Sequence, residues 1–103
     1  MKIGIYQIDW QMDLHNVMFM SHDYMTKETG SDKIDGDIYD LIWRGEVDCE
    51  DLDDVYRMFN INRPENFKGR SMTVSDVIEV YDPDGGSRFW YVDSIGFKEV
   101  GLK

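Results

Sequence analysis

The sequence predicts an α+β fold with a mainly antiparallel sheet, two helices and a C-terminal β-hairpin. Several short segments alternate apolar and polar residues with period two, as half-buried strands do. Residues 52–60 instead repeat their apolar side chains with helical spacing. Near the C-terminus, two apolar segments flank the turn-forming residues 82–86. Short strands interspersed with helices and followed by a hairpin favour the α+β class.

In the N-terminal half, residues 2–8 predict the first strand of the sheet because Ile3 and Ile5 lie on one side of the alternation. Residues 17–20 are apolar and predict a second short strand. Ser21 is placed to cap a helix that continues to about Glu28, and Gly30 follows as a helix-ending residue.

The middle of the chain predicts a strand and then the clearest helix. In the strand, residues 38–45, the side chains of Tyr39, Leu41 and Trp43 are expected on one face. In the helix, residues 52–60, the apolar residues recur at i, i+3, i+4 and i+7; they are Leu52, Val55, Tyr56 and Phe59. Asn62, Arg63 and Pro64 end this helix, and an extended loop follows.

The C-terminal part predicts a hairpin of residues 77–81 and 88–93, joined by the turn 82–86. Residues 97–102 are expected to add an edge strand. With 103 residues, the chain has the length of one domain, residues 1–103. The apolar fraction of 42% is large enough to bury a core that offsets the entropy lost on folding.

The composition excludes several classes of protein. No apolar segment has the length of a membrane helix, and residues 1–7 lack the apolar stretch of a signal peptide. A cytoplasmic protein without membrane contact is therefore expected. The single cysteine, Cys49, cannot form an internal disulfide, and neighbouring carboxylates are expected to raise its pKa, so no reactive thiol is predicted.

The charge is strongly negative, because 21 acidic residues face 11 basic ones and give a formal net charge of -10. Such a surface repels phosphate groups, so no direct binding to duplex DNA or to an anionic membrane is expected. A partner with a basic surface is favoured instead.

The acidic residues are concentrated in residues 32–54, where ten of them face only Lys33 and Arg44. The candidate partner-binding residues come from this segment; they are Asp35, Asp37, Asp40, Asp48, Glu50, Asp51, Asp53 and Asp54. Part of this charge has a structural use, since acids at a helix start interact favourably with the helix dipole and Asp53 precedes Arg57 by four residues.

Catalytic and metal-binding patterns are weak, so neither an enzyme nor a cofactor is expected. His15, His22 and Asp23 are a possible metal group, although hydrogen-bonded histidines are commoner at such positions. Residues 32–37 and 82–85 lack the spacing of a calcium loop and are interpreted as turns. A small enzyme would need a pocket that gathers either histidine with acids.

The three tryptophans, Trp10, Trp43 and Trp90, are either core residues or anchors of an interface. Aromatic residues on strands usually belong to the core. Trp10 differs from the other two because it follows the first strand within a polar stretch.

Residues 59–78 and 91–98, together with residues 5–7, 19–21 and 39–41, resemble the YodL-like domains of bacterial mobile genetic elements. The resemblance extends over nearly the whole chain, and its C-terminal half is the more specific part. Stand-alone members of this length look like small type II-A anti-CRISPR proteins. The resemblance therefore implies an inhibitor of a type II CRISPR effector nuclease or of its guide-RNA complex.

That role fits the charge, because such a nuclease binds nucleic acid in positive channels that a carboxylate array can occupy as a phosphate mimic. The alternative is an accessory protein-binding module of a mobile element that acts on a host or conjugation protein. In the segment most typical of the family, Arg57, Arg63, Lys68 and Arg70 reverse the charge. These cations either structure the loop against Asp76 or Asp93, or contact RNA or an acidic partner.

Overall fold

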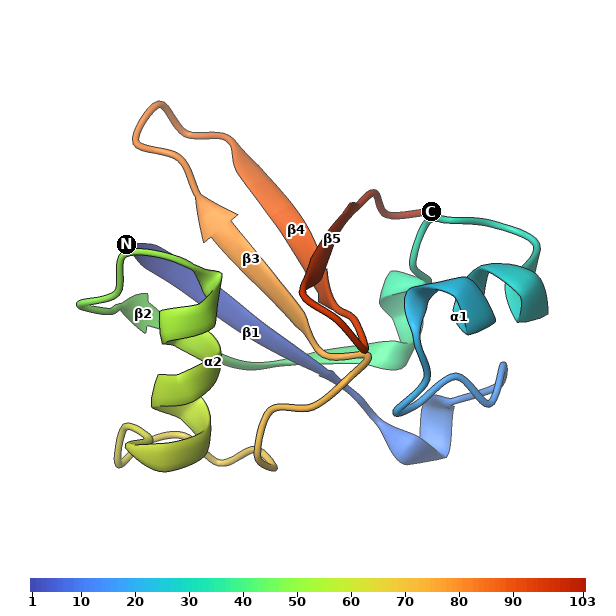
Figure 1. Ribbon diagram of the computed structural model, residues 1–103, viewed down its shortest axis with the longest axis horizontal. Helices are drawn as coiled ribbons and strands as arrows, with labels where there is room; N and C mark the ends of the chain where they lie inside the picture. Colours follow the sequence, from blue (N-terminus) through green and yellow to red (C-terminus); the bar gives the residue numbers. More distant parts are fainter.

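The computed structural model describes residues 1–103 and contains one five-stranded antiparallel sheet with the strand order β2-β1-β3-β4-β5 (Figure 1). The strands are β1 (Lys2–Ile8), β2 (Tyr39–Glu46), β3 (Val77–Tyr81), β4 (Ser87–Val92) and β5 (Phe97–Val100). The helices are α1 (His22–Thr29) and α2 (Leu52–Ile61), with two 3-10 turns, η1 (Trp10–Met12) and η2 (Gly36–Ile38). The predicted α+β class, the two helices and the C-terminal hairpin are confirmed.

The two helices begin and end at the residues that local chemistry favours. Ser21 accepts a hydrogen bond from the Tyr24 N–H at the start of α1, and Gly30 closes that helix in the left-handed conformation, with φ of 75°. Asp51 caps α2 in the same way, and Asn62 follows its last turn. Neither helix has the length and apolar character required to cross a membrane.

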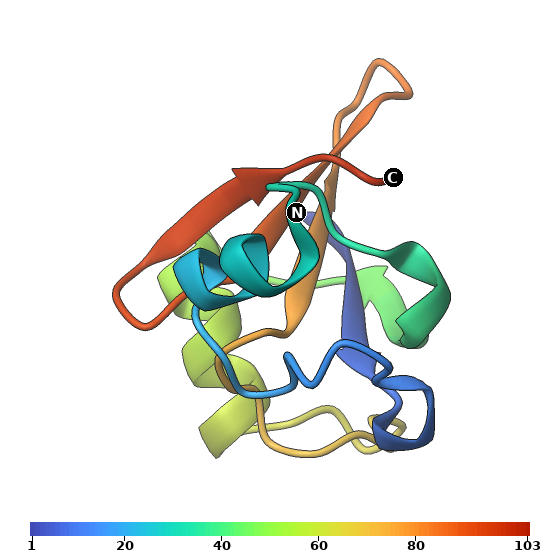
Figure 2. The ribbon, with the colours of Figure 1, turned by 90° about the vertical axis from the view of Figure 1, so that its right-hand side faces the viewer.

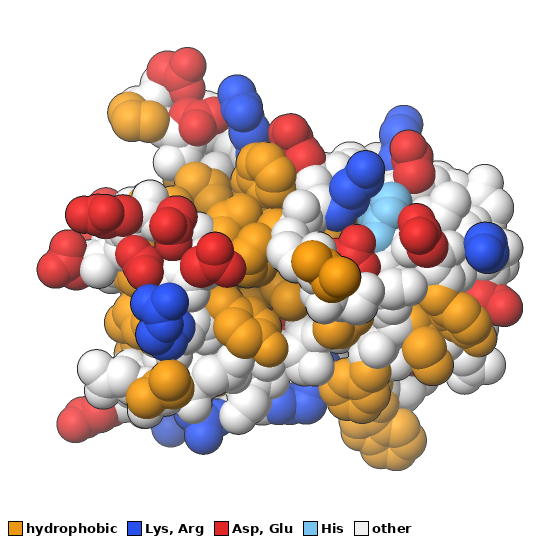
Figure 3. Space-filling model, in the orientation of Figure 1, with side chains coloured by type: hydrophobic (Ala, Val, Ile, Leu, Met, Phe, Trp, Pro, Cys, Tyr) orange, Lys and Arg blue, Asp and Glu red, His pale blue; other side chains and the backbone are white.

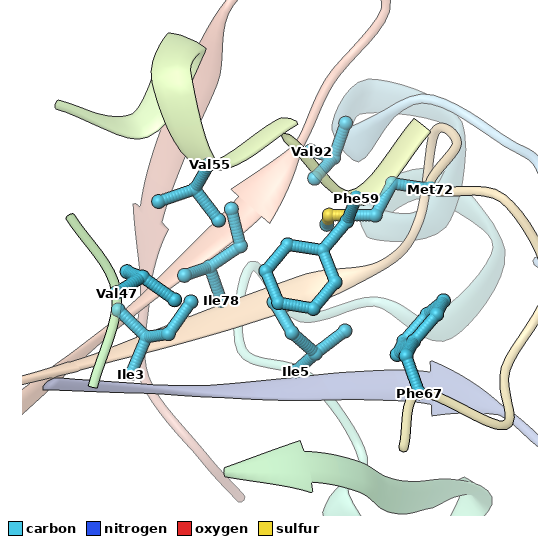
Figure 4. Close-up of a cluster of buried hydrophobic side chains, with 9 residues drawn as sticks. All are labelled: Ile3, Ile5, Val47, Val55, Phe59, Phe67, Met72, Ile78 and Val92. Atoms are coloured by element: carbon cyan, nitrogen blue, oxygen red, sulfur yellow. The ribbon is translucent and has the colours of Figure 1, made fainter. Parts of the chain in front are cut away.

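The sheet buries a separate core on each face because neighbouring residues of a strand point to opposite sides. Ile78 belongs to the core beneath α2, whereas the adjacent Val77 belongs to the core beneath α1. Figure 4 shows Val55 and Phe59 of α2 meeting the side chains of β1 and β3 in the first core. The two helices cover opposite ends of the molecule, and the β3–β4 turn extends beyond the rest of it (Figures 1 and 2).

The strand predicted at residues 17–20 is wrong, because this segment forms turns. Phe19 has φ of 70°, which an extended strand does not allow. The Asp13 carboxylate accepts hydrogen bonds from the N–H groups of Val17 and Met18, and the Ser75 hydroxyl accepts one from Phe19. Side chains thus satisfy the backbone donors that a neighbouring strand would otherwise pair.

The expectation that Tyr39, Leu41 and Trp43 share one face is also wrong. The pairing of β1 with β2 shifts between Ile5 and Tyr6, so that Ile42 is an extra residue in β2. Trp43 consequently packs on the core beneath α2, while Tyr39 packs on the core beneath α1. Leu41 is left exposed.

The side-chain amide of Gln7 fastens the loop between α2 and β3 to the end of β1. Its Nε2 donates to the Arg70 carbonyl at 2.9 Å and to Asp76 at 3.0 Å, and its Oε1 accepts from the Arg70 N–H at 3.1 Å. The backbone approaches so closely that a Cβ on Gly69 would lie 2.5 Å from Gln7 Oε1. Glycine is therefore required at position 69 for this contact.

A buried carboxylate completes the same network. The Asp76 side chain is fully buried and lies 3.8 Å from the Arg70 guanidinium. One cation of the loop between α2 and β3 therefore pairs with Asp76, which is one of the two roles that the sequence suggested for these cations. Asp76 Oδ2 accepts from the Thr73 N–H and from Gln7, whereas Oδ1 has no hydrogen-bond partner. Burial raises the pKa of Asp76 from 3.8 to about 6, despite these hydrogen bonds and the charge of Arg70.

Replacing Gly69 by alanine is expected to lower the free energy of unfolding by about 1 to 3 kcal/mol, because the methyl group would overlap Gln7, Ile42 and Phe67. Urea denaturation measures this change. The matched control is Gly86→Ala, since a Cβ there meets no atom closer than 3.6 Å. Equal stabilities of the two variants would contradict the proposed close approach.

The Asp76→Asn variant is expected to change how stability depends on pH. Because the pKa of Asp76 is higher in the folded than in the unfolded protein, the folded state binds more protons between about pH 4 and 6, and this contribution to stability is lost as the pH rises. The wild type should therefore lose up to about 3 kcal/mol relative to the variant across this range. Urea denaturation at pH 4, 5, 6 and 7 measures the free energy of unfolding of both proteins. The same dependence of this free energy on pH in both would refute the raised pKa of Asp76.

Candidate protein-binding site

Five carboxylates gather at the junction of β2 and α2. Three belong to the residues just before the helix, and two belong to its first turn. We name this surface the acidic ridge; it consists of Asp48, Glu50, Asp51, Asp53 and Asp54. Figure 3 shows acidic side chains crowded over the start of α2, beside an apolar strip. The structure thus brings together five of the eight predicted partner-binding residues.

Two residues of the acidic ridge have structural roles. Asp51 caps α2 by accepting a hydrogen bond from the Asp54 N–H at 2.9 Å. Asp54 accepts one from the Glu50 N–H and forms an ion pair with Arg57 at 3.1 Å. The pairing of Arg57 with Asp53 suggested by the sequence is therefore wrong, because Arg57 turns to the carboxylate three residues before it.

The side chains of Asp48, Glu50 and Asp53 are exposed and have no hydrogen-bond or ion-pair partner in the protein. These three carboxylates repel one another, which does not stabilise the fold. Only Asp53 offsets this cost, because it lies at the first turn of α2, where the helix dipole favours a negative charge. These three carboxylates are therefore free to meet cations of another molecule.

The other three predicted residues lie at the far end of β2. Asp35 caps the η2 turn, Asp37 lies in that turn, and Asp40 is near the start of β2. At 3.3 Å per residue, the strand from Asp40 to its last residue alone spans about 20 Å, and the acidic ridge lies beyond that end. Asp35 accepts hydrogen bonds from the Asp37 N–H and from His15 at 3.1 Å, and the bond to His15 lowers its pKa. The eight residues thus form two separate groups and not one continuous face.

Sequence reasoning missed a groove of about 230 Å³ between α2 and the turn that joins β4 to β5. Tyr56, Val74 and Phe97 form apolar walls, and Asp53 and Asp93 contribute carboxylates. No local signal marks this groove, because Tyr56 and Phe97 become neighbours only through the sheet.

A second hollow, of about 500 Å³, lies on the other side of the acidic ridge and contains Cys49. Its charges are mixed, since Arg57 lines it together with Asp48 and Asp54. Burial raises the pKa of the Cys49 thiol, and Asp54 adds to that effect. The expected direction is confirmed, although burial and not the carboxylates is its main cause.

The two histidines lie in different environments. His15 is half-buried and pairs with Asp35, whereas His22 is buried, stacks edge-on against Tyr91 and hydrogen-bonds the Asp32 carbonyl. No group of three histidine, cysteine or carboxylate side chains lies close enough to hold a metal ion.

Glu79 is a further carboxylate that the sequence did not single out. It is buried on β3 and accepts hydrogen bonds from the hydroxyls of Tyr6, Tyr81 and Ser87, at 2.7, 2.9 and 2.7 Å. Burial by itself would raise the pKa of Glu79, but these three bonds and the nearby Arg44 lower it. Its oxygens are occupied within the chain and tie β1, β3 and β4 together.

The tryptophans divide as the sequence suggested. Trp43 stacks edge-on against Phe59 and donates a hydrogen bond to the Asn66 side chain, and Trp90 is half-buried on β4. Trp10 is 71% exposed on the η1 turn, which confirms that it differs from the other two.

The comparison with family models matches residues 2–102 to the YodL-like domain. No curated protein and no solved structure matches the chain.

Substitutions in the acidic ridge are expected to affect stability differently, because some of its carboxylates stabilise the helix and others have no partner. Asp51→Ala is expected to cost about 1 kcal/mol, because it removes the cap of α2. The triple variant Asp48→Asn, Glu50→Gln, Asp53→Asn is expected to change stability by less than about 1 kcal/mol, since these side chains are exposed and make no hydrogen bond or ion pair in the protein. Thermal and urea denaturation measure both, and a larger loss in the triple variant would contradict this division.

Proposed function

This chain belongs to the YodL-like domain family, and we propose that it is an anti-CRISPR inhibitor that binds a type II-A RNA-guided nuclease through the acidic ridge. The target is part of the proposal: the family match shows the YodL-like domain, and we extend it to the anti-CRISPR role that the sequence resemblance implies. The observation that carries the binding mechanism is the group of unpartnered carboxylates at positions 48, 50 and 53.

The charge of the ridge supports a basic protein surface as the partner. A nuclease of this class holds its nucleic acids in positively charged channels. Carboxylates clustered before and within the first turn of α2 concentrate negative charge in a small area, so they can replace phosphates along a short part of such a channel. The ridge is too small to imitate a long duplex, and a local block of guide loading or DNA capture is the expected action.

The second candidate function is an accessory module of a mobile element that binds a host or conjugation protein. The separation of the predicted acids into two groups favours it, because a continuous negative face would suit a nucleic-acid mimic better. The roles of Asp35, Asp51 and Asp54 within the fold favour it as well. In both functions, the chain acts by binding and not by catalysis.

Cleavage of target DNA by a purified type II-A nuclease with guide RNA tests the first function. We expect the wild-type protein to inhibit cleavage, and the triple variant Asp48→Asn, Glu50→Gln, Asp53→Asn to need at least about tenfold more protein, a loss of about 1.4 kcal/mol. Inhibition should weaken with salt, because exposed charges are screened. Addition before and after guide loading distinguishes the two blocked steps.

The matched control is Asp32→Asn, Asp37→Asn, Asp40→Asn, which removes the same charge from exposed, unpartnered side chains between the end of α1 and the start of β2. This control should inhibit like the wild type. Equal loss in both triple variants would show an effect of net charge alone and refute the ridge as the binding surface. No inhibition and no complex in size-exclusion chromatography would favour the accessory module.

A further inference from the structure

We propose that the groove between α2 and the β4–β5 turn is a docking site for an arginine side chain on a partner protein. The arginine stem would pack between Tyr56 and Phe97, and its guanidinium would meet the carboxylates of Asp53 and Asp93. All four residues line this groove.

The carboxylates of the groove have unused acceptor capacity. Asp53 has no partner in the protein and is exposed at the first turn of α2. Asp93 Oδ1 accepts hydrogen bonds from the N–H groups of His22 and Ser94, which hold its side chain in place, whereas Oδ2 has no partner. No lysine or arginine of the chain forms an ion pair with either residue. The cation that these oxygens suit must come from another molecule.

The walls between these carboxylates are apolar. Tyr56 and Phe97 are half-buried and pack against the core beneath α2, and the buried Val92 forms part of the lining. Gly96, with φ of 72°, forms the turn that brings β5 back along the groove. Figure 3 shows an apolar strip beside the acidic side chains at the start of α2. An occupant must therefore be apolar along its length and cationic at its end.

Arginine fits this description better than lysine. Its guanidinium is planar, stacks on aromatic rings and can donate to two carboxylates at once. Its aliphatic stem can cover apolar walls while the charge stays at the carboxylates. A volume of about 230 Å³ accommodates one long side chain and not a whole helix. The partner is therefore a basic protein segment with one arginine inserted, and its flanking cations can face the acidic ridge.

This inference rests on the proposed function in one respect, that the partner is a basic protein. It adds a specific anchor, which distinguishes one basic surface from another, whereas the acidic ridge supplies attraction that many basic surfaces share. Its test needs no nuclease, so the docking site and the anti-CRISPR role can fail separately.

The experiment is an NMR titration of the ¹⁵N-labelled protein with a capped pentapeptide that carries one arginine between two leucines. The comparison peptide replaces arginine by citrulline, which has the same shape without the charge. We expect saturable shifts of the backbone amides of Tyr56, Ser94 and Gly96, and at least tenfold weaker binding of the citrulline peptide. Asp53→Asn should weaken arginine-peptide binding about tenfold, while Asp48→Asn, which removes a ridge carboxylate outside the groove and lowers only the general attraction, should weaken it at most about threefold.

Three results would overturn the proposal. The first is equal binding of the two peptides, or equal weakening by Asp53→Asn and Asp48→Asn, because either would show unspecific attraction to the acidic ridge. The second is the absence of saturable shifts at the groove. The third is a shift of the same amides with protein concentration alone, which would assign the groove to a second copy of this chain.

Discussion

The amide of Gln7 is the contact on which the position of the candidate surfaces depends. It donates to the carbonyl of Arg70 and accepts from its N–H, so that it pairs with the loop as the backbone of a neighbouring strand would. Through this pairing the loop after α2 lies against the end of β1 and inserts Phe67 and Met72 into the core beneath α2. The core-facing side of the helix that carries the acidic ridge is thereby packed by this loop as well as by the sheet.

The placement of α2 over the sheet explains why a groove exists beside it. Its buried residues Val55 and Phe59 pack with side chains of β1 and β3. The sheet continues beyond this contact through β4 and β5, where Phe97 and Trp90 are only half-buried. The same face of the sheet thus provides a closed core beneath α2 and an open apolar strip next to it.

The acidic residues serve two physical purposes that compete for the same side chains. Asp51 and Asp54 stabilise the start of α2, and the oxygens they use there are not available to a partner. Asp48, Glu50 and Asp53 carry charge without internal contacts, which costs some repulsion and leaves the charge available for binding. Asp53 belongs both to the ridge and to the groove, so it links long-range attraction with a specific contact.

Local patterns determined most of the fold: the alternation in β1, the spacing of Val55 and Phe59 in α2, and the cap residue Ser21 predict their elements from neighbours within a few positions. The same reasoning failed at residues 17–20 and at the faces of β2, where Ser75 and an extra residue opposite β1 decide the conformation. It found the acidic charge but not its division into two groups at opposite ends of a strand. Only the tertiary structure joined Gln7 to Arg70 and placed Asp53 and Asp93 in one groove, because such contacts between distant residues arise from packing and leave no periodic signal along the chain.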